Sequence, residues 1–261
     1  MLFDSTEVAL VDAHCHIDLY PRPTEVVAEI ERAQVHTIAV TNAPFVFQHT
    51  LQLSESSRYV HPAIGMHPEL VESHGNQLER MISLLDQTRF IGEVGLDFMT
   101  NDRELRKRQS DIFNRILEEC ARSRDKVLTV HSRRSARDVI AAVGPCYPGT
   151  VILHWFSGSL SDVRKAISYG LWFSINIAMT QSANGLAIIA ELPRDRVLTE
   201  TDGPFVKKPD GTPLHPPEVA ALLPVLSQVW RVDEAEAKQM VLKNFETATA
   251  LTAVSSRSDS L

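Results

Sequence analysis

Residues 89–96 read RFIGEVGL, a short apolar run that is interrupted by one carboxylate, Glu93. Seven other runs have a similar apolar and β-branched character. They are VALVDAH (8–14), HTIAVTN (36–42), PAIGMHP (62–68), KVLTVHS (126–132), TVILHWF (150–156), LWFSINI (171–177) and RVLTETD (196–202). Near-continuous apolar runs are typical of parallel strands that are buried on both faces, and a closed β/α barrel requires eight of them. We therefore expect a (β/α)8 barrel of the TIM type.

The segments between these runs have helical patterns, which favours an alternation of strands and helices. The clearest is 102–124, in which apolar residues recur at helical spacing. Further helices are expected at 24–34, 76–87, 134–143, 160–169, 184–192, 217–229 and 233–250, and the weakest helical pattern is that of 43–58. The Pro- and Gly-rich segment 203–218 predicts a long ordered loop.

Composition and length bound the remaining possibilities. The chain has 261 residues, of which 44% are hydrophobic and 23% charged, as in an ordinary globular protein. No linker-like change in composition is visible, so residues 1–250 are expected to form one domain and the polar residues 251–261 a disordered tail. The net charge of −7 argues against a broad basic face for nucleic acid.

The cysteines and the N-terminus predict a protein of the cytoplasm. Cys15, Cys120 and Cys146 are far apart and form no CxxC pair, so neither a disulfide framework nor a zinc knuckle is expected. The first residues have no basic segment followed by an apolar one, as a signal peptide would. No uncharged apolar run approaches the roughly 18 residues of a membrane helix.

Histidines and carboxylates gather at the ends of the predicted strands. In a β/α barrel the carboxyl ends of all strands meet at one mouth, where active sites are built. Six such residues would meet there: His14, His16, Glu93, His131, His154 and Asp202. Their common location predicts a metal site, since His, Glu and Asp are ligands for divalent cations.

The spacing of His14 and His16 supports this interpretation. Side chains alternate along a strand, so both imidazoles lie on one face while Cys15 faces the other way. A single buried His is commonly a hydrogen-bonded core residue, whereas two converging imidazoles suit a cation. Glu93 lies in a buried strand, where an isolated carboxylate is costly, so it is either paired with an Arg or bound to a metal.

A carboxylate has two oxygens, so Glu93 is able to bridge two cations. We expect one site formed with His14, His16 and Asp202, and a second with His131 and His154. Motifs for a serine nucleophile, a P-loop or a dinucleotide fold are lacking in the sequence, which leaves metal-activated water. Glu93 and Asp202 are the predicted catalytic residues, with Asp202 as an acceptor for the proton of the water.

Other residues are predicted near the same mouth. His67 ends the third run, and either a substrate contact or a supporting hydrogen bond would explain it. Arg133 follows His131 by two positions and suits recognition of a phosphate. Lys207 and Lys208 are expected to be solvated, and Asp97 is expected to begin a turn or cap a helix rather than bind metal.

Six motifs in order, VDAHCHID, IGMHP, IGEVGLD, VHSRR, ILHWFSGS and TETDGP, resemble those of the TatD family of metal-dependent deoxyribonucleases over about residues 10–250. The resemblance implies a TIM barrel that hydrolyses phosphodiester bonds in DNA with two divalent metal ions. It implies that His14, His16, Glu93 and Asp202 bind one ion and that Glu93, His131 and His154 bind the other. These are the six residues already reached from their positions.

Within the family, the runs HCHIDLYP, HSRR, LHWFSGS and TETDGPF look most like the TatD-type member of bacterial Qat anti-phage systems. That narrower resemblance implies other Qat proteins as partners. Trp155 departs from the family pattern, which has a small residue or Cys at this position in many members. Its indole would either stack a base or pack the barrel, and packing is the simpler expectation.

Two other functions remain open. Related amidohydrolases act on lactones, amides or phosphotriesters, and many place a carbamylated Lys where this chain has Glu93. A binding subunit that has lost turnover would also keep the barrel, although the complete six-residue set argues against it. The low positive charge predicts contact with DNA ends or short single strands. Together, His, Glu and Asp side chains accept Mg²⁺, Mn²⁺ or Zn²⁺ as the divalent cation.

Overall fold

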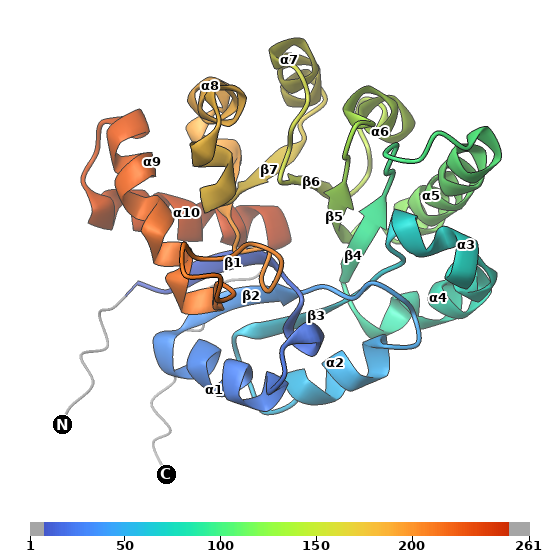
Figure 1. The fold of residues 1–261 in the computed structure, drawn as a ribbon, viewed down its shortest axis with the longest axis horizontal. Coiled ribbons are helices and arrows are strands. Elements are labelled where there is room, and N and C mark those ends of the chain that lie inside the picture. Colours follow the sequence, from blue (N-terminus) through green and yellow to red (C-terminus); the bar gives the residue numbers. More distant parts are fainter. Residues whose placement is uncertain (1–7, 251–261) are drawn as a thin grey trace.

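The eight predicted strands form one parallel sheet in the order β1 to β8, which curls into a barrel surrounded by helices (Figure 1). The structure is a computed structural model that describes residues 8–250. The strands are β1 (Leu10–Cys15), β2 (Val35–Ala39), β3 (Val60–Ile64), β4 (Phe90–Gly95), β5 (Val127–His131), β6 (Thr150–His154), β7 (Trp172–Ile175) and β8 (Val197–Thr199). The predicted (β/α)8 barrel is confirmed, while the predicted tail at 251–261 lies outside the described residues.

Hydrogen bonds beyond the end of β8 bring the last strand to the first. The backbone N–H of Asp202 donates to the carbonyl of His14 at 2.9 Å, and that of His16 donates to the carbonyl of Gly203 at 2.8 Å. The carboxylate of Asp12 accepts from the backbone N–H and the hydroxyl of Thr201. These contacts complete the barrel and fix the segment after β8 against the end of β1.

Helices follow most of the strands, close to where the sequence predicts them. They are α1 (Pro23–Ala33), α2 (Phe47–Ser54), α3 (Val71–His74), α4 (Leu78–Leu84), α5 (Arg103–Ser123), α6 (Ala136–Val143), α7 (Leu160–Ser168), α8 (Ala183–Glu191), α9 (Leu223–Trp230) and α10 (Glu234–Thr249). Local sequence explains several starts: Asp102 accepts hydrogen bonds from the first turn of α5, and Ser159 with Asp162 forms a capping box on α7. None of the helices in residues 8–250 is long and apolar enough to cross a membrane.

Some boundaries differ from the sequence-based expectation. The segment 43–58 contains α2, and the expected helix at 217–229 is a 3-10 helix (Pro216–Leu222) followed by α9. Pro216 and Pro217 have no backbone N–H, which restricts the start of that segment. Residues 203–215 form the predicted ordered loop, in which Lys207 and Pro213 make an isolated antiparallel bridge.

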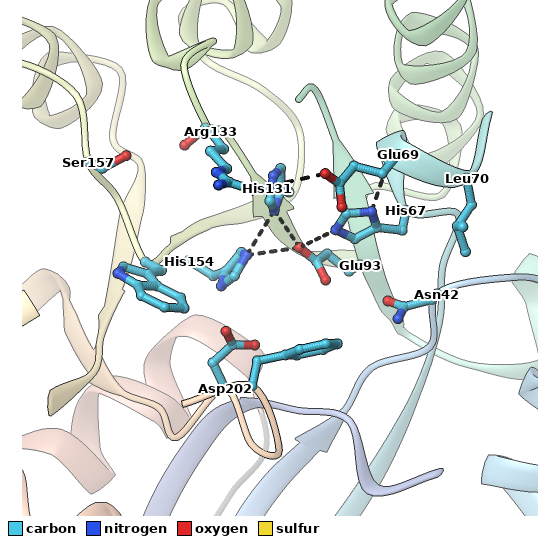
Figure 2. A pocket seen from close by; sticks show the side chains of 13 residues that line it. Asn42, His67, Glu69, Leu70, Glu93, His131, Arg133, His154, Ser157 and Asp202 are labelled. Carbon is cyan, nitrogen blue, oxygen red and sulfur yellow. Dashed lines mark hydrogen bonds and ion pairs between the residues drawn. The ribbon is translucent and has the colours of Figure 1, made fainter. Parts of the chain in front are cut away.

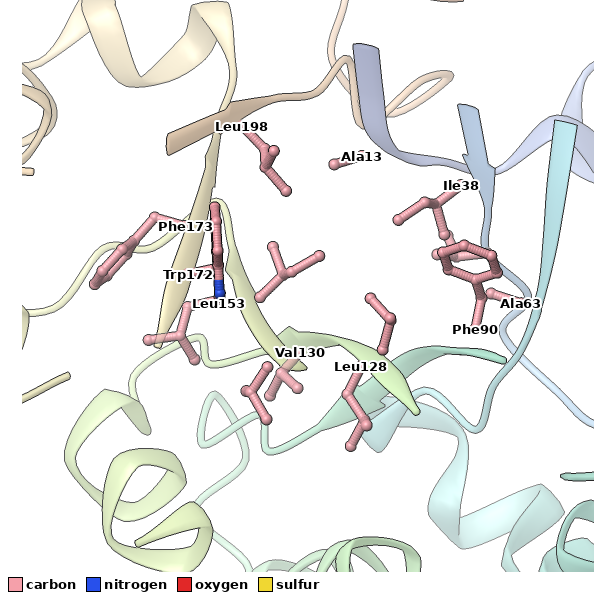
Figure 3. Packing of buried hydrophobic residues seen from close by; sticks show 14 of the residues in the cluster. Ala13, Ile38, Ala63, Phe90, Leu128, Val130, Leu153, Trp172, Phe173 and Leu198 are labelled. Carbon is pink, nitrogen blue, oxygen red and sulfur yellow. The ribbon is translucent and has the colours of Figure 1, made fainter. Parts of the chain in front are cut away.

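The core fills the barrel and the space between strands and helices. Every residue of β2, β4, β7 and β8 is buried, as the near-continuous apolar runs predict. Figure 3 shows Ala13, Ile38, Leu128, Leu153 and Leu198 among the buried side chains contributed by different strands. This packing makes the strands a rigid support for the side chains at their carboxyl ends.

Candidate metal centre

All six residues of the predicted metal set meet at the carboxyl end of the barrel. Figure 2 shows Glu93 beside His131 and His154, with Asp202 across from them. His14 and His16 approach from β1, and their Nε2 atoms lie 3.3 Å apart. His14, His16, Glu93, His154 and Asp202 are each at most 4% exposed, so this is a nearly dry cluster of nitrogen and oxygen ligands.

The two oxygens of Glu93 face different groups of histidines. Oε2 lies 3.5 Å from Nε2 of His14 and 3.3 Å from Nε2 of His16. Oε1 lies 2.6 Å from Nδ1 of His131 and 2.9 Å from Nε2 of His154. The residues thus divide around Glu93 into the two sets that the sequence suggested.

Asp202 belongs to the first of these sets by position. Its Oδ1 lies 3.6 Å from Nε2 of His14 and 3.6 Å from Nε2 of His16. The sequence placed Asp202 at the end of the last strand, but β8 ends at Thr199 and Asp202 follows in the loop with φ +49°. Its hydrogen bond to His14, rather than sheet pairing, holds it beside the histidines.

Irregular strand pairing aims the ligands of β1 and β4. Residues 12–15 of β1 pair with residues 37–39 of β2, so β1 has one residue more than its partner there. Residues 91–94 of β4 likewise pair with residues 128–130 of β5. His14 lies within the first irregularity and Glu93 within the second. An extra residue in a strand bends it and redirects a side chain, which is why bulges are frequent beside active sites.

Two carboxylates that the sequence analysis did not assign to the site support its histidines. Asp97 accepts from Nε2 of His131 at 2.8 Å, so it does more than begin a turn. Oε1 of Glu200 is 3.6 Å from Nδ1 of His154 and accepts hydrogen bonds from Asn176 and the backbone of residue 155. The sequence does contain a signal for Glu200. Like Glu93, it is a carboxylate in or beside a buried strand, where a charged group needs a partner.

The charges in the cluster depend strongly on one another. Burial alone would raise the pKa of Glu93, but the imidazoles of His67, His154 and His131 outweigh it and hold that pKa well below its ordinary value. Burial raises the pKa of Asp202 well above its ordinary value. Burial and the neighbouring His154 lower the pKa of His14, which favours the neutral imidazole that a cation requires.

Burial disfavours the charged imidazoles of His131 and His154, but neighbouring carboxylates outweigh this effect and raise the pKa of both. Hydrogen bonds to Asp97 and Glu93 raise the pKa of His131. The charges of Glu93 and Glu200 raise the pKa of His154 well above its ordinary value. The neighbouring carboxylates thus favour the protonated form of both imidazoles.

A cavity of about 550 Å³ opens above the cluster. His67 and Arg133 both line it, where the sequence predicted substrate-binding residues. Nε2 of His67 lies 3.3 Å from Oε1 of Glu93, and Nη1 of Arg133 lies 3.9 Å from Glu69 across the cavity wall. Their positions suit contacts with a ligand that reaches the carboxylate of Glu93.

Two aromatic residues also line this cavity. The expectation that Trp155 packs the barrel is wrong, because its side chain is 37% exposed and lines the cavity. Phe205, which the sequence analysis did not single out, is 54% exposed, and its ring meets that of His16 edge-on with 5.0 Å between centroids. Among the loop cations, Lys207 is exposed as expected, while Lys208 forms an ion pair with Glu218 at 2.8 Å.

Comparisons with known proteins agree with this geometry. The family model described as "TatD related DNase" matches residues 11–249. The Escherichia coli K12 protein YjjV, named an uncharacterized metal-dependent hydrolase, is 27% identical over 91% of this chain and 96% of its own length. Its crystal structure, called that of a TatD homologue, superimposes with a TM-score of 0.83 over 93% of this chain and 98% of its own.

Two further relatives have nuclease names. The zebrafish protein tatdn3, named as a candidate deoxyribonuclease, is 29% identical over 74% of this chain and 79% of its own length. The deoxyribonuclease Tat-D of Schizosaccharomyces pombe is 30% identical over 44% of this chain and 37% of its own length. With the family model matching almost the whole barrel and the ligand cluster in place, the chain belongs to the TatD family of metal-dependent hydrolases.

Proposed function

We propose that this protein is a metal-dependent phosphodiesterase that hydrolyses DNA, at strand ends or in short single-stranded segments. The observation that supports it most is the position of Glu93, with one oxygen toward His14 and His16 and the other toward His131 and His154. The nuclease names of the family model and of two relatives support the choice of DNA as substrate.

The ligand set fits two divalent cations. Nε2 of His14, Nε2 of His16 and Oε2 of Glu93 lie within about 3.5 Å of one another. Nδ1 of His14 is 2.6 Å from the hydroxyl of Thr129, which is able to accept a hydrogen bond from Nδ1–H and leave Nε2 free as a ligand. Imidazole and carboxylate ligands accept Zn²⁺, Mn²⁺ or Mg²⁺.

In this proposal Glu93 would contribute to both metal positions; His14, His16 and Asp202 would hold one cation, and His131 and His154 the other. Cations bound there would supply Lewis acidity toward a phosphoryl oxygen and toward the attacking water. Asp202 would accept a proton from that water, because its carboxylate borders both the cluster and the cavity.

Residues of the cavity wall would position the substrate. Arg133 would bind a phosphoryl oxygen in place of its distant contact with Glu69, since a guanidinium binds phosphate with two parallel hydrogen bonds. His67 would donate to an oxygen of the same phosphate. Each of these roles belongs to a side chain that lines the cavity above Glu93.

The alternatives of the sequence analysis have less support. Glu93 occupies the position where many two-metal amidohydrolases use a carbamylated Lys, so no carbamylation is expected here. The resemblance to Qat defence systems depends on short sequence runs, and the relatives named above do not support it. Partnership with Qat proteins therefore remains a separate hypothesis, which co-purification from a host with the full operon would test.

Cleavage of end-labelled strands tests the proposed function. The purified protein, loaded in turn with Mg²⁺, Mn²⁺ and Zn²⁺, is incubated with 3′- and 5′-labelled single-stranded DNA under single-turnover conditions. We expect metal-dependent cleavage that chelation abolishes and that Glu93→Ala reduces by about 100-fold or more. Hydrolysis of amides or lactones with no cleavage of DNA would contradict the proposal, as would undiminished cleavage by Glu93→Ala.

A further inference from the structure

Large apolar side chains are exposed around the mouth of the barrel. Five of the six that are exposed in residues 8–250 lie in the segments that directly follow β1, β2, β4, β6 and β8. The five are Leu19, Phe45, Met99, Trp155 and Phe205, and the sixth, Leu186, is on α8. Exposed apolar side chains that occur singly need no explanation, but a group of them around a site indicates a binding surface.

Trp155 is held in this position by its backbone. It has φ +39°, which is unfavourable for a bulky residue, and its N–H donates to the buried carboxylate of Glu200 at 3.1 Å. Glu200 is in turn fixed by Ser174 and Asn176, so the backbone of Trp155 is anchored to the barrel. As a result, the indole of Trp155, the residue that follows His154, lines the cavity.

Phe205 reaches the same cavity from the loop after β8. Its backbone N–H donates to the carbonyl of Asp202 at 2.9 Å, and its ring meets the ring of His16. The ring of Phe205 therefore lies beside His16, and Trp155, the residue after His154 in the chain, lines the same cavity. A phosphate at the centre would place its neighbouring nucleosides within the part of the cavity that these rings line.

The charges of the cavity argue that it recognises the bases of a nucleic-acid strand rather than its sugar-phosphate backbone. Of the described residues that line it, Arg133 is the only Arg or Lys, whereas Glu69, Glu93 and Asp202 are carboxylates. Apart from the phosphate at the proposed metal positions, a strand would thus find few positive side chains for its phosphates, and further binding energy must come from elsewhere. Stacking on aromatic rings supplies it for unpaired bases, whose faces a duplex covers.

We propose that Trp155 and Phe205 form a nucleobase-binding subsite, which stacks the unpaired bases next to the phosphodiester bond that is cleaved. This inference rests on the proposed function and deepens it, because it assigns the preference for unpaired bases near the cleaved bond to these two rings. A protein partner on the same rings is the competing explanation, and it predicts no dependence on the base.

Trp155 itself provides a direct binding signal. The chain has three Trp residues, and the other two, Trp172 and Trp230, are 5% and 2% exposed. Tryptophan fluorescence of the metal-loaded protein is titrated with deoxyadenosine 5′-monophosphate and with 2-deoxyribose 5-phosphate, which have the same phosphate and no cleavable diester. We expect saturable quenching by the nucleotide, with binding about tenfold or more tighter than that of the sugar phosphate. Equal binding of the two compounds would overturn the proposal.

Matched variants distinguish stacking of a base on an aromatic ring from nonspecific binding to exposed apolar side chains. Phe205→Leu should weaken nucleotide binding by about tenfold, while Phe205→Tyr should retain it and Leu186→Ala, on α8, should leave it unchanged. Circular dichroism confirms that each variant is folded. Nucleotide binding that a folded Phe205→Leu retains in full would contradict a role for this ring.

Cleavage kinetics provide the second test. Trp155→Leu and Phe205→Leu should raise KM for single-stranded DNA by about tenfold and have little effect on a strand with abasic analogues on both sides of the cleaved bond. If DNA is cleaved but base and abasic strands are equivalent, the subsite is wrong and the nuclease function stands. If no strand is cleaved but quenching depends on the base, the nuclease function is wrong, and only the binding of bases by these rings stands.

Discussion

The carboxylate of Asp12 accepts two hydrogen bonds from Thr201, one from its backbone N–H at 2.9 Å and one from its hydroxyl at 2.6 Å. Asp12 lies in β1 and Thr201 follows β8, so this contact joins the two ends of the sheet. Because Asp202 follows Thr201 and bonds to His14, the same contact helps to fix the distance between Asp202 and His14. The Asp12–Thr201 pair therefore links barrel closure to the candidate metal centre.

Asp12→Ala is expected to destabilise the barrel, since it leaves both donors of Thr201 buried without a partner. The loss should be about 3 kcal/mol in the free energy of unfolding, or a fall in Tm of roughly 6 to 12 °C. Asp12→Asn, which keeps an acceptor for the backbone N–H, should lose less. Thermal unfolding measures the difference, and equal stability of Asp12→Ala and the wild type would show that this contact does not support the fold.

Asp97→Ala is expected to weaken metal binding without unfolding the chain. Asp97 fixes the ring of His131 through Nε2, and loss of such a supporting contact typically lowers metal affinity by about 10- to 100-fold. Competition with a fluorescent chelator measures the affinity, and Asp97→Asn, which retains an oxygen acceptor, is the matched control. An affinity that Asp97→Ala leaves unchanged would argue against His131 as a ligand.

Glu200→Ala is expected to destabilise the protein by about 3 kcal/mol or more, because Ser174, Asn176 and the backbone N–H of Trp155 would each lose a buried acceptor. Glu200→Gln keeps an acceptor and should retain most of the stability. Chemical denaturation of both variants provides the measurement. Equal midpoints for the Ala and Gln variants would contradict the assigned network.

The stability of the protein is expected to fall in acid through a second histidine pair, far from the metal centre. Burial lowers the pKa of His36 to about 4, and burial together with His36 lowers that of His61 to about 3. In the unfolded chain both titrate near 6.5, so below that pH the unfolded state binds more protons than the folded one. Their stabilising effect is present above about pH 6.5 and is lost as the pH falls toward 4.

His61→Gln tests this dependence, because an amide is able to keep the contact with Nδ1 of His36, which is 3.2 Å in the wild type, but does not ionise. Free energies of unfolding measured from pH 7.5 to 4 should decline less steeply in the variant. Parallel curves for the two proteins would exclude His61 from the acid response.

The sequence was sufficient to predict the barrel and the meeting of the six residues at its mouth, for a simple reason. Strand periodicity identifies where each run ends, and in a parallel barrel all such ends meet, so the positions of His131 and His154 follow without knowledge of the packing. The division of ligands around Glu93 follows from the order of the strands. Neither inference requires exact side-chain geometry.

Features that depend on tertiary pairing were not predictable. The irregular pairing around His14 and Glu93 arises from the fit of neighbouring strands, which leaves no local sequence signal. The exposure of Trp155 depends on its positive φ and on Glu200, a residue 45 positions away. The role of Asp97 was missed because its sequence context, between a strand and a turn, is equally typical of a helix cap.

The central claim is that Glu93 joins two metal positions, and a count of bound ions tests it most directly. Purified wild-type protein is saturated with Mn²⁺, passed through a desalting column and analysed for metal per chain, in parallel with Glu93→Ala. We predict two ions per wild-type chain and loss of tight binding at both positions in Glu93→Ala, whose circular dichroism should remain native. A single ion in the wild type, or two ions retained by Glu93→Ala, would contradict the account.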